Sequence, residues 1–209
     1  MIKVILCDDH AVVRRGIRDT ISEAVDIRVV AEAGSYPELR ELMRTQPCDV
    51  LLLDLNMPGR GGLEVLTALR DEGSTVKTLV VSMYPEDQYA IRCLRAGARG
   101  YLNKAGEPTE LVSAIRTVMQ GRKYLTPEVA QMLVDKLSAP QSEELHASLS
   151  ERELQTLQKI ASGRKLSEIA EELMISPKTV SVYRARVLDK LQLGNNAEMT
   201  VYAIRNGLL

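Results

Sequence analysis

Short apolar runs alternate with amphipathic stretches along the first 121 residues of the chain. The apolar runs have the length of strands, and the stretches between them repeat apolar residues at helical spacing. The pattern predicts strands at 2–7, 27–33, 50–54, 77–82 and 100–102. It predicts helices at 11–24, 36–45, 62–71, 86–96 and 109–120, the last capped by Thr109 and ended by Gly121. Five such repeats are typical of a parallel sheet with helices on both faces.

The pattern changes after residue 121. Thr126-Pro127 is a typical helix start, and it predicts a short helix that ends at about residue 137. The next residues, 138–144, are rich in Ser, Pro and Glu, a composition that favours a solvated linker. We therefore predict a first domain at 1–121, followed by a linker with a short helix at 122–147.

The last part of the chain, 148–209, is predicted to be an all-helical domain. Ser150 and Glu153 have the spacing of a capping box, which marks the start of a helix. Ser176-Pro177 marks another start, because it places a cap before a proline in the first turn. These caps and the breakers between them predict four helices, at about 151–162, 166–173, 177–191 and 196–206.

Composition refines this picture only in part. Hydrophobic residues make up 45% and charged residues 26% of the chain, so each domain can bury a core. Cys7, Cys48 and Cys93 are an odd number in or near apolar segments, which favours buried thiols in a reducing compartment over disulfides. No apolar run has membrane-spanning length and no signal-peptide pattern is present, so we expect a cytoplasmic protein without a membrane partner.

Polar side chains follow the predicted strands where each strand ends. They are Asp8, Asp9, Asp54, Ser82 and Lys104. The carboxyl ends of parallel strands form the ligand-binding edge of such a sheet, so we expect these residues to lie close together. Three carboxylates would repel one another unless a cation lies between them, and Mg²⁺ prefers oxygen ligands. With a metal and an ammonium neutralising its oxygens, a phosphoryl group could be accepted by a carboxylate as an aspartyl phosphate.

A plainer interpretation is that Asp8 and Asp9 only cap the helix that begins near Ala11, as aspartate often does. That interpretation would have to explain Asp54 and Lys104 independently, because neither lies near this helix in the sequence. A shared site accounts for all four residues at once.

The two histidines, His10 and His146, are far apart in the sequence, and no cysteine pair has the spacing of zinc ligands. We therefore predict no zinc site. His10 follows the acidic pair, where it invites a catalytic role. A lone histidine at a helix start is usually solvated, and we interpret it in that way.

The motifs Asp54-Leu-Asn-Met-Pro-Gly59, Val80-Val-Ser82 and Gly100-Tyr-Leu-Asn-Lys104, together with Asp8-Asp9, resemble those of the receiver domain of two-component response regulators. The resemblance covers nearly all of residues 1–121. It implies a flavodoxin-like α/β fold, with a five-stranded parallel sheet in the order 2-1-3-4-5.

The same resemblance implies a separate role for each acidic residue. Asp54 would be the phosphoacceptor. Asp9, Asp54 and the backbone carbonyl of Asn56 would bind Mg²⁺ directly, and Asp8 would bind it through water.

The resemblance also implies a role for three residues on the fourth and fifth strands. Lys104 would pair with the phosphoryl group, whereas Ser82 would be the hydroxyl switch that responds to it. Tyr101 stands where receivers have an aromatic side chain that turns inward on activation. A half-buried strand tyrosine without a switch role is the alternative for Tyr101.

The predicted helix at 177–191 has two unlike faces. One face carries Val180, Val187 and Leu191, spaced by nearly whole turns, and predicts packing in a core. The opposite face carries mainly small, polar or basic side chains, namely Lys178, Ser181, Val182, Ala185 and Arg186. A short helix, a tight turn and a helix of this kind fit insertion into the major groove of DNA.

We expect this helix to make two kinds of DNA contact. Basic and hydroxyl side chains would contact phosphates, namely Lys178, Thr179, Arg186 and Lys190. Ser181, Val182 and Ala185 would approach base edges and thymine methyl groups. In the alternative interpretation, the basic residues only solvate an exposed helix.

The motifs Leu149-Ser-Glu-Arg-Glu153, Ile175-Ser-Pro-Lys-Thr-Val180 and Lys190-Leu191 resemble the LuxR-type helix-turn-helix domain, a four-helix DNA-binding module. Together the two halves resemble the NarL/FixJ branch of response regulators. That resemblance implies that a sensor histidine kinase phosphorylates Asp54. Phosphorylation would then favour a homodimer that binds double-stranded promoter DNA and regulates transcription. We expect no enzyme activity beyond self-phosphorylation and self-dephosphorylation.

Two other functions fit part of the sequence. A Mg²⁺-dependent aspartyl phosphatase also uses a carboxylate nucleophile, but such enzymes resemble Asp-x-Asp on their first strand. Here Asp54 is followed by Leu55-Asn56 and lies on the third predicted strand. In the second alternative, the C-terminal helices bind a protein instead of DNA. Strong salt dependence of duplex binding would favour DNA over a protein partner.

Overall fold

The computed structural model describes residues 1–138 and 145–209, with the backbone alone for 136–138. Apart from residue 138, the predicted linker run 138–144 lies outside the described residues. The chain forms two compact units, Met1–Ala139 and Pro140–Leu209. None of the helices in the described ranges has the length and apolar character that a membrane crossing requires.

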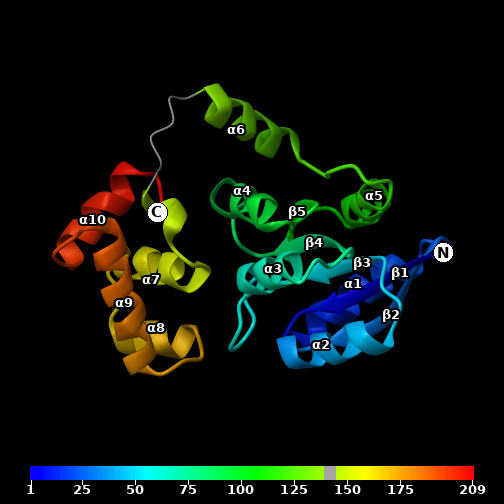
Figure 1. Ribbon diagram of the computed structural model, residues 1–209, viewed down its shortest axis with the longest axis horizontal. Helices are drawn as coiled ribbons and strands as arrows, with labels where there is room; N and C mark the ends of the chain where they lie inside the picture. Colours follow the sequence, from blue (N-terminus) through cyan, green and yellow to red (C-terminus); the bar gives the residue numbers. More distant parts are fainter. Residues whose placement is uncertain (139–144) are drawn as a thin grey trace. The chain divides into compact units, whose positions relative to one another are not determined.

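A five-stranded parallel sheet in the order β2-β1-β3-β4-β5 forms the centre of the first unit (Figure 1). Its strands are β1 (Ile2–Cys7), β2 (Ile27–Ala33), β3 (Val50–Leu53), β4 (Lys77–Ser82) and β5 (Gly100–Asn103). The helices that connect and follow them are α1 (Ala11–Ser22), α2 (Tyr36–Thr45), α3 (Gly62–Asp71), α4 (Glu86–Ala96) and α5 (Pro108–Met119). The predicted α/β fold and strand order are confirmed.

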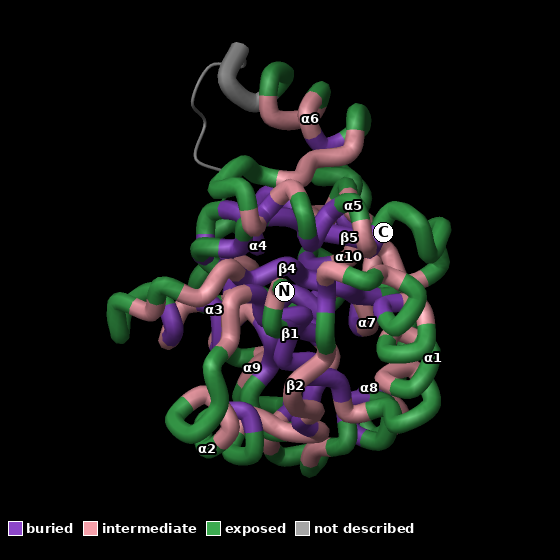
Figure 2. Tube along the Cα trace, turned by 90° about the vertical axis from the view of Figure 1, so that its right-hand side faces the viewer, coloured by how far each residue is buried: buried purple, intermediate pink, exposed green. Residues whose placement is uncertain are grey.

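The three central strands are apolar at most positions because helices cover both faces of the sheet. On one face, alternate residues of β1, β3 and β4 pack with Ile21 of α1 and with an apolar stripe of α5. The intervening residues, such as Ile5 and Leu51, are fully buried on the opposite face. Figure 2 shows this continuous buried core along the labelled strands β1 and β4.

Some predicted element ends differ from the structure. Strand β3 ends at Leu53, one residue early, so Asp54 opens the following connection, and β5 continues to Asn103. The predicted cap at Thr109 is wrong, because α5 begins at Pro108, whose fixed φ suits the first helical position. Gly121 follows α5 with φ +81°, as its predicted role at the helix end requires.

Helix α6 (Pro127–Ser138), predicted as part of the linker, belongs to the first unit. It begins after Thr126, whose hydroxyl donates a hydrogen bond to Glu86 Oε2 of α4 at 2.6 Å and accepts one from the Val129 N–H at 3.3 Å. Val129 is buried, and α6 packs against α4 (Figure 1). The first unit therefore extends beyond residue 121.

The second unit consists of a short 3-10 turn, η1 (Leu145–Ser148), followed by helices. The helices are α7 (Glu151–Ala161), α8 (Leu166–Glu172), α9 (Pro177–Leu191) and α10 (Asn196–Arg205). The predicted capping box is confirmed, because Ser150 Oγ accepts from the Glu153 N–H at 3.3 Å and Glu153 Oε2 accepts from the Ser150 N–H at 2.7 Å. The four predicted helices are all present.

Candidate functional site

Strand register brings the predicted polar residues to one edge of the sheet. Cys7 of β1 pairs with Leu53 of β3, and the Asp54 N–H donates to the Cys7 carbonyl at 2.9 Å. Asp8 and Asp54 therefore leave neighbouring strands at the same level. On the other side of β3, Ser82 ends β4, and its carbonyl accepts a hydrogen bond from the Lys104 N–H at 2.8 Å.

The Lys104 ammonium lies between two buried carboxylates. Its Nζ is 2.7 Å from Asp8 Oδ2 and 3.1 Å from Asp54 Oδ2. Asp8 is 1% and Asp54 3% exposed. Burial raises the pKa of Asp54, the Lys104 charge opposes that shift, and the Asp8 charge adds to it. One ammonium therefore does not offset the cost of holding the Asp54 carboxylate out of water.

The same edge offers donor atoms for a cation. Asp8, Asp9, His10 and Asp54 each contribute one ligand atom, and these four atoms lie within 4.8 Å of one another. Three buried oxygens, Asp8 Oδ2, Asp9 Oδ1 and Asp54 Oδ2, lack a directed hydrogen bond within the described part of the chain. Each lies near a cation or imidazole nitrogen, but lone pairs remain for an ion. This donor set fits a divalent metal such as Mg²⁺.

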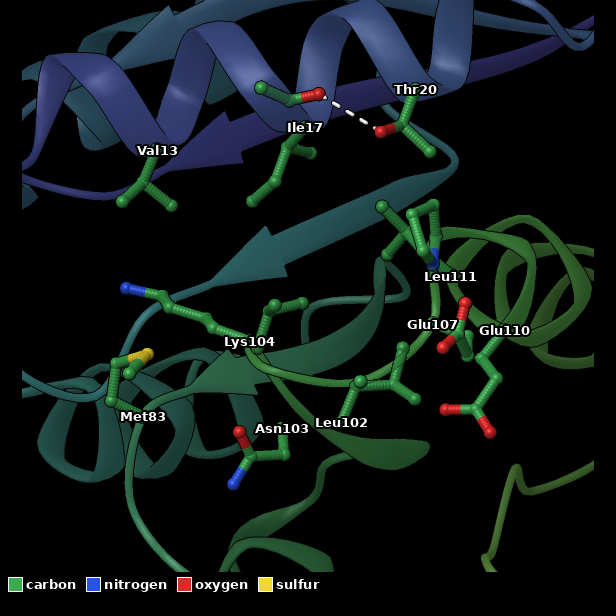
Figure 3. A pocket seen from close by; sticks show the side chains of 14 residues that line it. Val13, Ile17, Thr20, Met83, Leu102, Asn103, Lys104, Glu107, Glu110 and Leu111 are labelled. Carbon is green, nitrogen blue, oxygen red and sulfur yellow. Dashed lines mark hydrogen bonds between the residues drawn. The ribbon is translucent and has the colours of Figure 1, made fainter.

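Asp54 is nearly inaccessible as a residue, yet an opening of about 190 Å³ lies over it. Its lining includes Asn56, predicted to bind the metal, Ser82, predicted as the switch, and Lys104, predicted to pair with the phosphoryl group. A neighbouring pocket of about 350 Å³ also contains Lys104 (Figure 3). Val13 and Ile17 of α1 line this second pocket, which is mainly apolar. A small charged group can thus reach Asp54 from solvent.

The region around Asp54 is held in place by its own backbone and by close packing. Asp54 Oδ1 accepts a hydrogen bond from the Leu55 N–H at 2.8 Å. Gly62, at the start of α3, lies against this turn, and a Cβ there would be 2.3 Å from the Asp54 carbonyl oxygen. Sequence reasoning missed Gly62, since nothing near it in the chain indicates this approach.

Ser82 and Tyr101 are joined through the backbone of Tyr84. Ser82 Oγ accepts a hydrogen bond from the Tyr84 N–H at 3.3 Å, and the Tyr101 hydroxyl donates to the Tyr84 carbonyl at 2.8 Å. Tyr101 is 2% exposed, and its burial raises the pKa of its hydroxyl. The tyrosine is thus turned inward and fully buried, which differs from the half-buried alternative.

His10 is closer to the acidic site than the sequence interpretation allowed. Its side chain is 57% exposed, but Nδ1 lies 2.7 Å from Asp9 Oδ1 and 3.4 Å from Asp8 Oδ1. The backbone N–H of His10 donates to Asp8 Oδ1 at 2.8 Å. The position directly after two metal-type aspartates was the available signal for this placement.

Helix α9 has the two faces that its sequence predicts. Val180, Val187 and Leu191 are buried in the second unit. The predicted DNA-facing side chains are exposed, namely Lys178, Ser181, Val182, Ala185 and Arg186. Val182 is 43% exposed, although its side chain is apolar.

The N-terminal end of α9 is firmly capped. Ser176 Oγ accepts from the Thr179 N–H at 3.1 Å, and the two hydroxyls lie 2.8 Å apart. The Thr179 hydroxyl is therefore part of the cap, and the Thr179 side chain is half-buried. The cap fixes the direction of the helix end that would meet DNA.

Lys190, predicted as a phosphate contact, has partners within the second unit. Its Nζ lies 2.6 Å from Glu153 Oε2 and 3.1 Å from the Ser148 carbonyl. Burial alone would raise the pKa of Glu153, but hydrogen bonds from Lys190 and Ser150 outweigh it and hold that pKa below its usual range. Lys190 thus secures the start of α7, which the sequence could not indicate because its partner lies 37 residues away.

Comparisons with known proteins agree with both units. Residues 4–116 match the family model described as the response regulator receiver domain, and residues 147–203 match the model described as bacterial regulatory proteins, luxR family. Response regulator UvrY of Escherichia coli (strain K12) is 42% identical over 209 residues, covering 100% of this chain and 96% of UvrY. Response regulator GacA of Pseudomonas aeruginosa is 39% identical over 210 residues, covering 100% and 98%.

A solved structure of RcsB from Salmonella enterica serovar Typhimurium, bound to promoter rprA in the presence of the phosphomimetic BeF3-, is also similar. It is 26% identical with a TM-score of 0.63, over 96% of this chain and 97% of that chain. The receiver match alone spans more than half of the chain, and the UvrY match spans its whole length. The chain therefore belongs to the NarL/FixJ branch of two-component response regulators, transcription regulators that join a receiver domain to a LuxR-type DNA-binding domain.

Proposed function

We propose that a sensor histidine kinase transfers a phosphoryl group to Asp54 of this chain. A carboxylate oxygen of Asp54 forms a bond to phosphorus, and the bond between phosphorus and the donor nitrogen breaks, with its electron pair returning to the nitrogen. The observation that carries the proposal is the Lys104 ammonium, 3.1 Å from Asp54 Oδ2 beneath an opening to solvent. Lys104 neutralises charge on the transferred group and keeps the carboxylate oriented.

Mg²⁺ is the proposed cofactor of this step. Asp9, Asp54 and the backbone carbonyl of Asn56 would hold it directly, and Asp8 would hold it through water. The ion would supply positive charge to the phosphoryl oxygens. Two observations support Mg²⁺ at this site. Buried carboxylate oxygens of the acidic cluster have lone pairs left for an ion, and the raised pKa of Asp54 shows that Lys104 alone does not offset its burial.

We propose that Ser82 and Tyr101 report the phosphoryl group to the rest of the first unit. The Ser82 hydroxyl would turn toward a phosphoryl oxygen and release the Tyr84 N–H that it accepts from. The Tyr101 hydroxyl is bonded to the carbonyl of the same Tyr84, so the two side chains respond together. The result is a population shift in the segment between β4 and α4.

The proposed output is a homodimer that binds double-stranded promoter DNA through α9. Lys178 and Arg186 would contact phosphates, and Ser181, Val182 and Ala185 would face base edges. The exposure of these side chains supports this assignment. A solved structure of two RcsB dimers bound to two parallel DNAs is 26% identical to this chain, and it supports DNA binding by a dimer here. Binding to promoter DNA also favours a cytoplasmic location.

Incubation with a small phosphodonor and Mg²⁺ tests the proposal. We expect one phosphoryl group per chain, found on Asp54 by mass spectrometry, and none in Asp54→Asn. Release of many equivalents of phosphate per chain would instead support the aspartyl phosphatase alternative. Asn56 argues against that outcome, because it puts a neutral amide beside the opening where such an enzyme would have its second acid.

A further inference from the structure

His10 is placed as a metal ligand would be, although the proposed Mg²⁺ site does not use it. It is the residue before α1 and has an extended backbone, with φ −90° and ψ 104°. That backbone directs the imidazole toward the acidic pair, with Nδ1 at 2.7 Å from Asp9 Oδ1 and 3.4 Å from Asp8 Oδ1. The ring thus meets two carboxylates from one side.

These distances match the spacing of ligand atoms around one ion. Two ligand atoms that are each about 2.1 Å from a metal and at right angles lie about 3 Å apart. The two distances from His10 Nδ1 lie on either side of that value. The fourth atom, from Asp54, is within 4.8 Å of the other three. An ion could bind among them with small movements of the side chains.

Lys104 does not occupy the side of the cluster that His10 faces. The ammonium pairs with Asp8 Oδ2, whereas the imidazole lies near Asp8 Oδ1. The two oxygens of one carboxylate therefore face different groups. An ion held beside His10 need not displace the lysine.

We propose that His10 is a ligand at the acidic site and that the site prefers divalent transition ions that bind imidazole over Mg²⁺. Carboxylates alone suit hard ions such as Mg²⁺, whereas an imidazole nitrogen raises the affinity for ions such as Co²⁺ and Zn²⁺. The proposal deepens the proposed function, because it rests on the same carboxylates. It adds a ligand that the receiver resemblance does not assign.

Co²⁺ binding to the full-length protein tests this assignment. The visible absorption of Co²⁺ would be titrated for the wild type, for His10→Gln, and for the matched control His146→Gln, which alters the other histidine of the chain. We expect His10→Gln to bind Co²⁺ about tenfold or more weakly, by analogy with the loss of supporting groups at metal sites. His146→Gln should match the wild type, and Mg²⁺ affinity should stay the same in all three.

Proton NMR of the Co²⁺ complex separates coordination from a hydrogen bond between His10 and Asp9. A bound imidazole should give strongly shifted ring-proton signals that disappear in His10→Gln and remain in His146→Gln. Equal Co²⁺ affinity and spectra in wild type and His10→Gln would overturn the proposal. That result would leave the proposed function intact, provided that Asp54 of His10→Gln is still phosphorylated with Mg²⁺. A wild type that binds neither Mg²⁺ nor Co²⁺ would overturn both.

Discussion

Lys104 Nζ lies 3.1 Å from Asp54 Oδ2, and the two residues come from connections that follow β5 and β3. The same ammonium is 2.7 Å from Asp8 Oδ2. A single cation thus links the carboxylates that leave β1 and β3. We expect this link to stabilise the first unit before a phosphoryl group or metal binds.

Removing this ammonium should destabilise the first unit. Lys104→Met leaves two buried carboxylates without their shared cation, so we expect the free energy of unfolding to fall by about 3 kcal/mol in chelator at neutral pH. Mg²⁺ should restore part of the loss, because it supplies positive charge to the same oxygens. Urea denaturation with and without Mg²⁺ measures both effects.

The exposed pair Arg40–Glu72, at 2.7 Å, provides the control. Arg40→Met should change the free energy of unfolding far less than Lys104→Met does, since exposed ion pairs contribute little. An equal loss in both variants would mean that burial of the Lys104 site has no energetic consequence.

The raised pKa of Asp54 predicts how the effect of Asp54→Asn on stability depends on pH. A carboxyl whose pKa is higher in the folded state gives stability that is present below its unfolded-state pKa and is lost as pH rises through the folded value. Asp54→Asn does not ionise, so in chelator it should be more stable than the wild type at neutral pH. The difference should shrink as pH falls toward about 3.9, the ordinary value for aspartate.

Asp26 offers a control of opposite sign. A hydrogen bond from Arg116 lowers the pKa of Asp26, so its ionised form stabilises the fold. Asp26→Asn should therefore be less stable than the wild type at neutral pH, with the difference lost only as pH falls below about 3.9, through the lowered folded-state pKa. Thermal melts across this pH range would refute the account if both variants shifted in the same direction.

Gly62 sets the position of the Asp54 turn. Gly62→Ala would bring a Cβ within 2.3 Å of the Asp54 carbonyl oxygen, so the backbone must move. We expect a loss of about 2 kcal/mol in stability and slower phosphorylation by a small phosphodonor. Gly16→Ala in α1, where a Cβ meets nothing within 4 Å, should instead stabilise by about 1 kcal/mol. If Gly62→Ala were phosphorylated at the wild-type rate, the position of the Asp54 turn would not matter for phosphorylation.

Two lysines of α9 should behave differently despite their similar chemistry. Lys178→Ala should weaken binding to all duplexes and reduce the slope of log affinity against log salt by about 1, without loss of stability. Lys190→Ala should lower the free energy of unfolding by about 2 kcal/mol, because it leaves Glu153 without its ammonium. Anisotropy titrations at several salt concentrations measure the salt slope, and urea melts measure the free energy of unfolding. Identical salt slopes for Lys178→Ala and the wild type would remove Lys178 from the DNA face.

The sheet and the acidic site could be predicted because their signals are local. Each strand is a short apolar run, and Asp8, Asp54 and Lys104 stand directly after such runs, so topology alone brings them together. The faces of α9 were equally readable, since helical periodicity separates Val180 and Val187 from the exposed residues.

The remaining features depend on partners distant in the sequence. The ion pair of Lys190 with Glu153 joins residues that are 37 positions apart, so the sequence does not indicate it. Helix α6 looks like part of a linker until Thr126 is placed against Glu86. His10 was read as solvated because its contacts with Asp8 and Asp9 depend on backbone direction, which residue type alone does not determine.

The central claim is that phosphorylation of Asp54 controls DNA binding, and an affinity measurement tests it most directly. The duplex would be one selected from genomic DNA by the phosphorylated protein, and binding would be followed by fluorescence anisotropy. Phosphorylated wild type should bind about a hundredfold more tightly than unphosphorylated wild type, because pairing raises the effective concentration of the second α9. Asp54→Asn treated with the same phosphodonor should bind like the unphosphorylated protein. Tight binding by treated Asp54→Asn, equal to that of the phosphorylated wild type, would contradict the account.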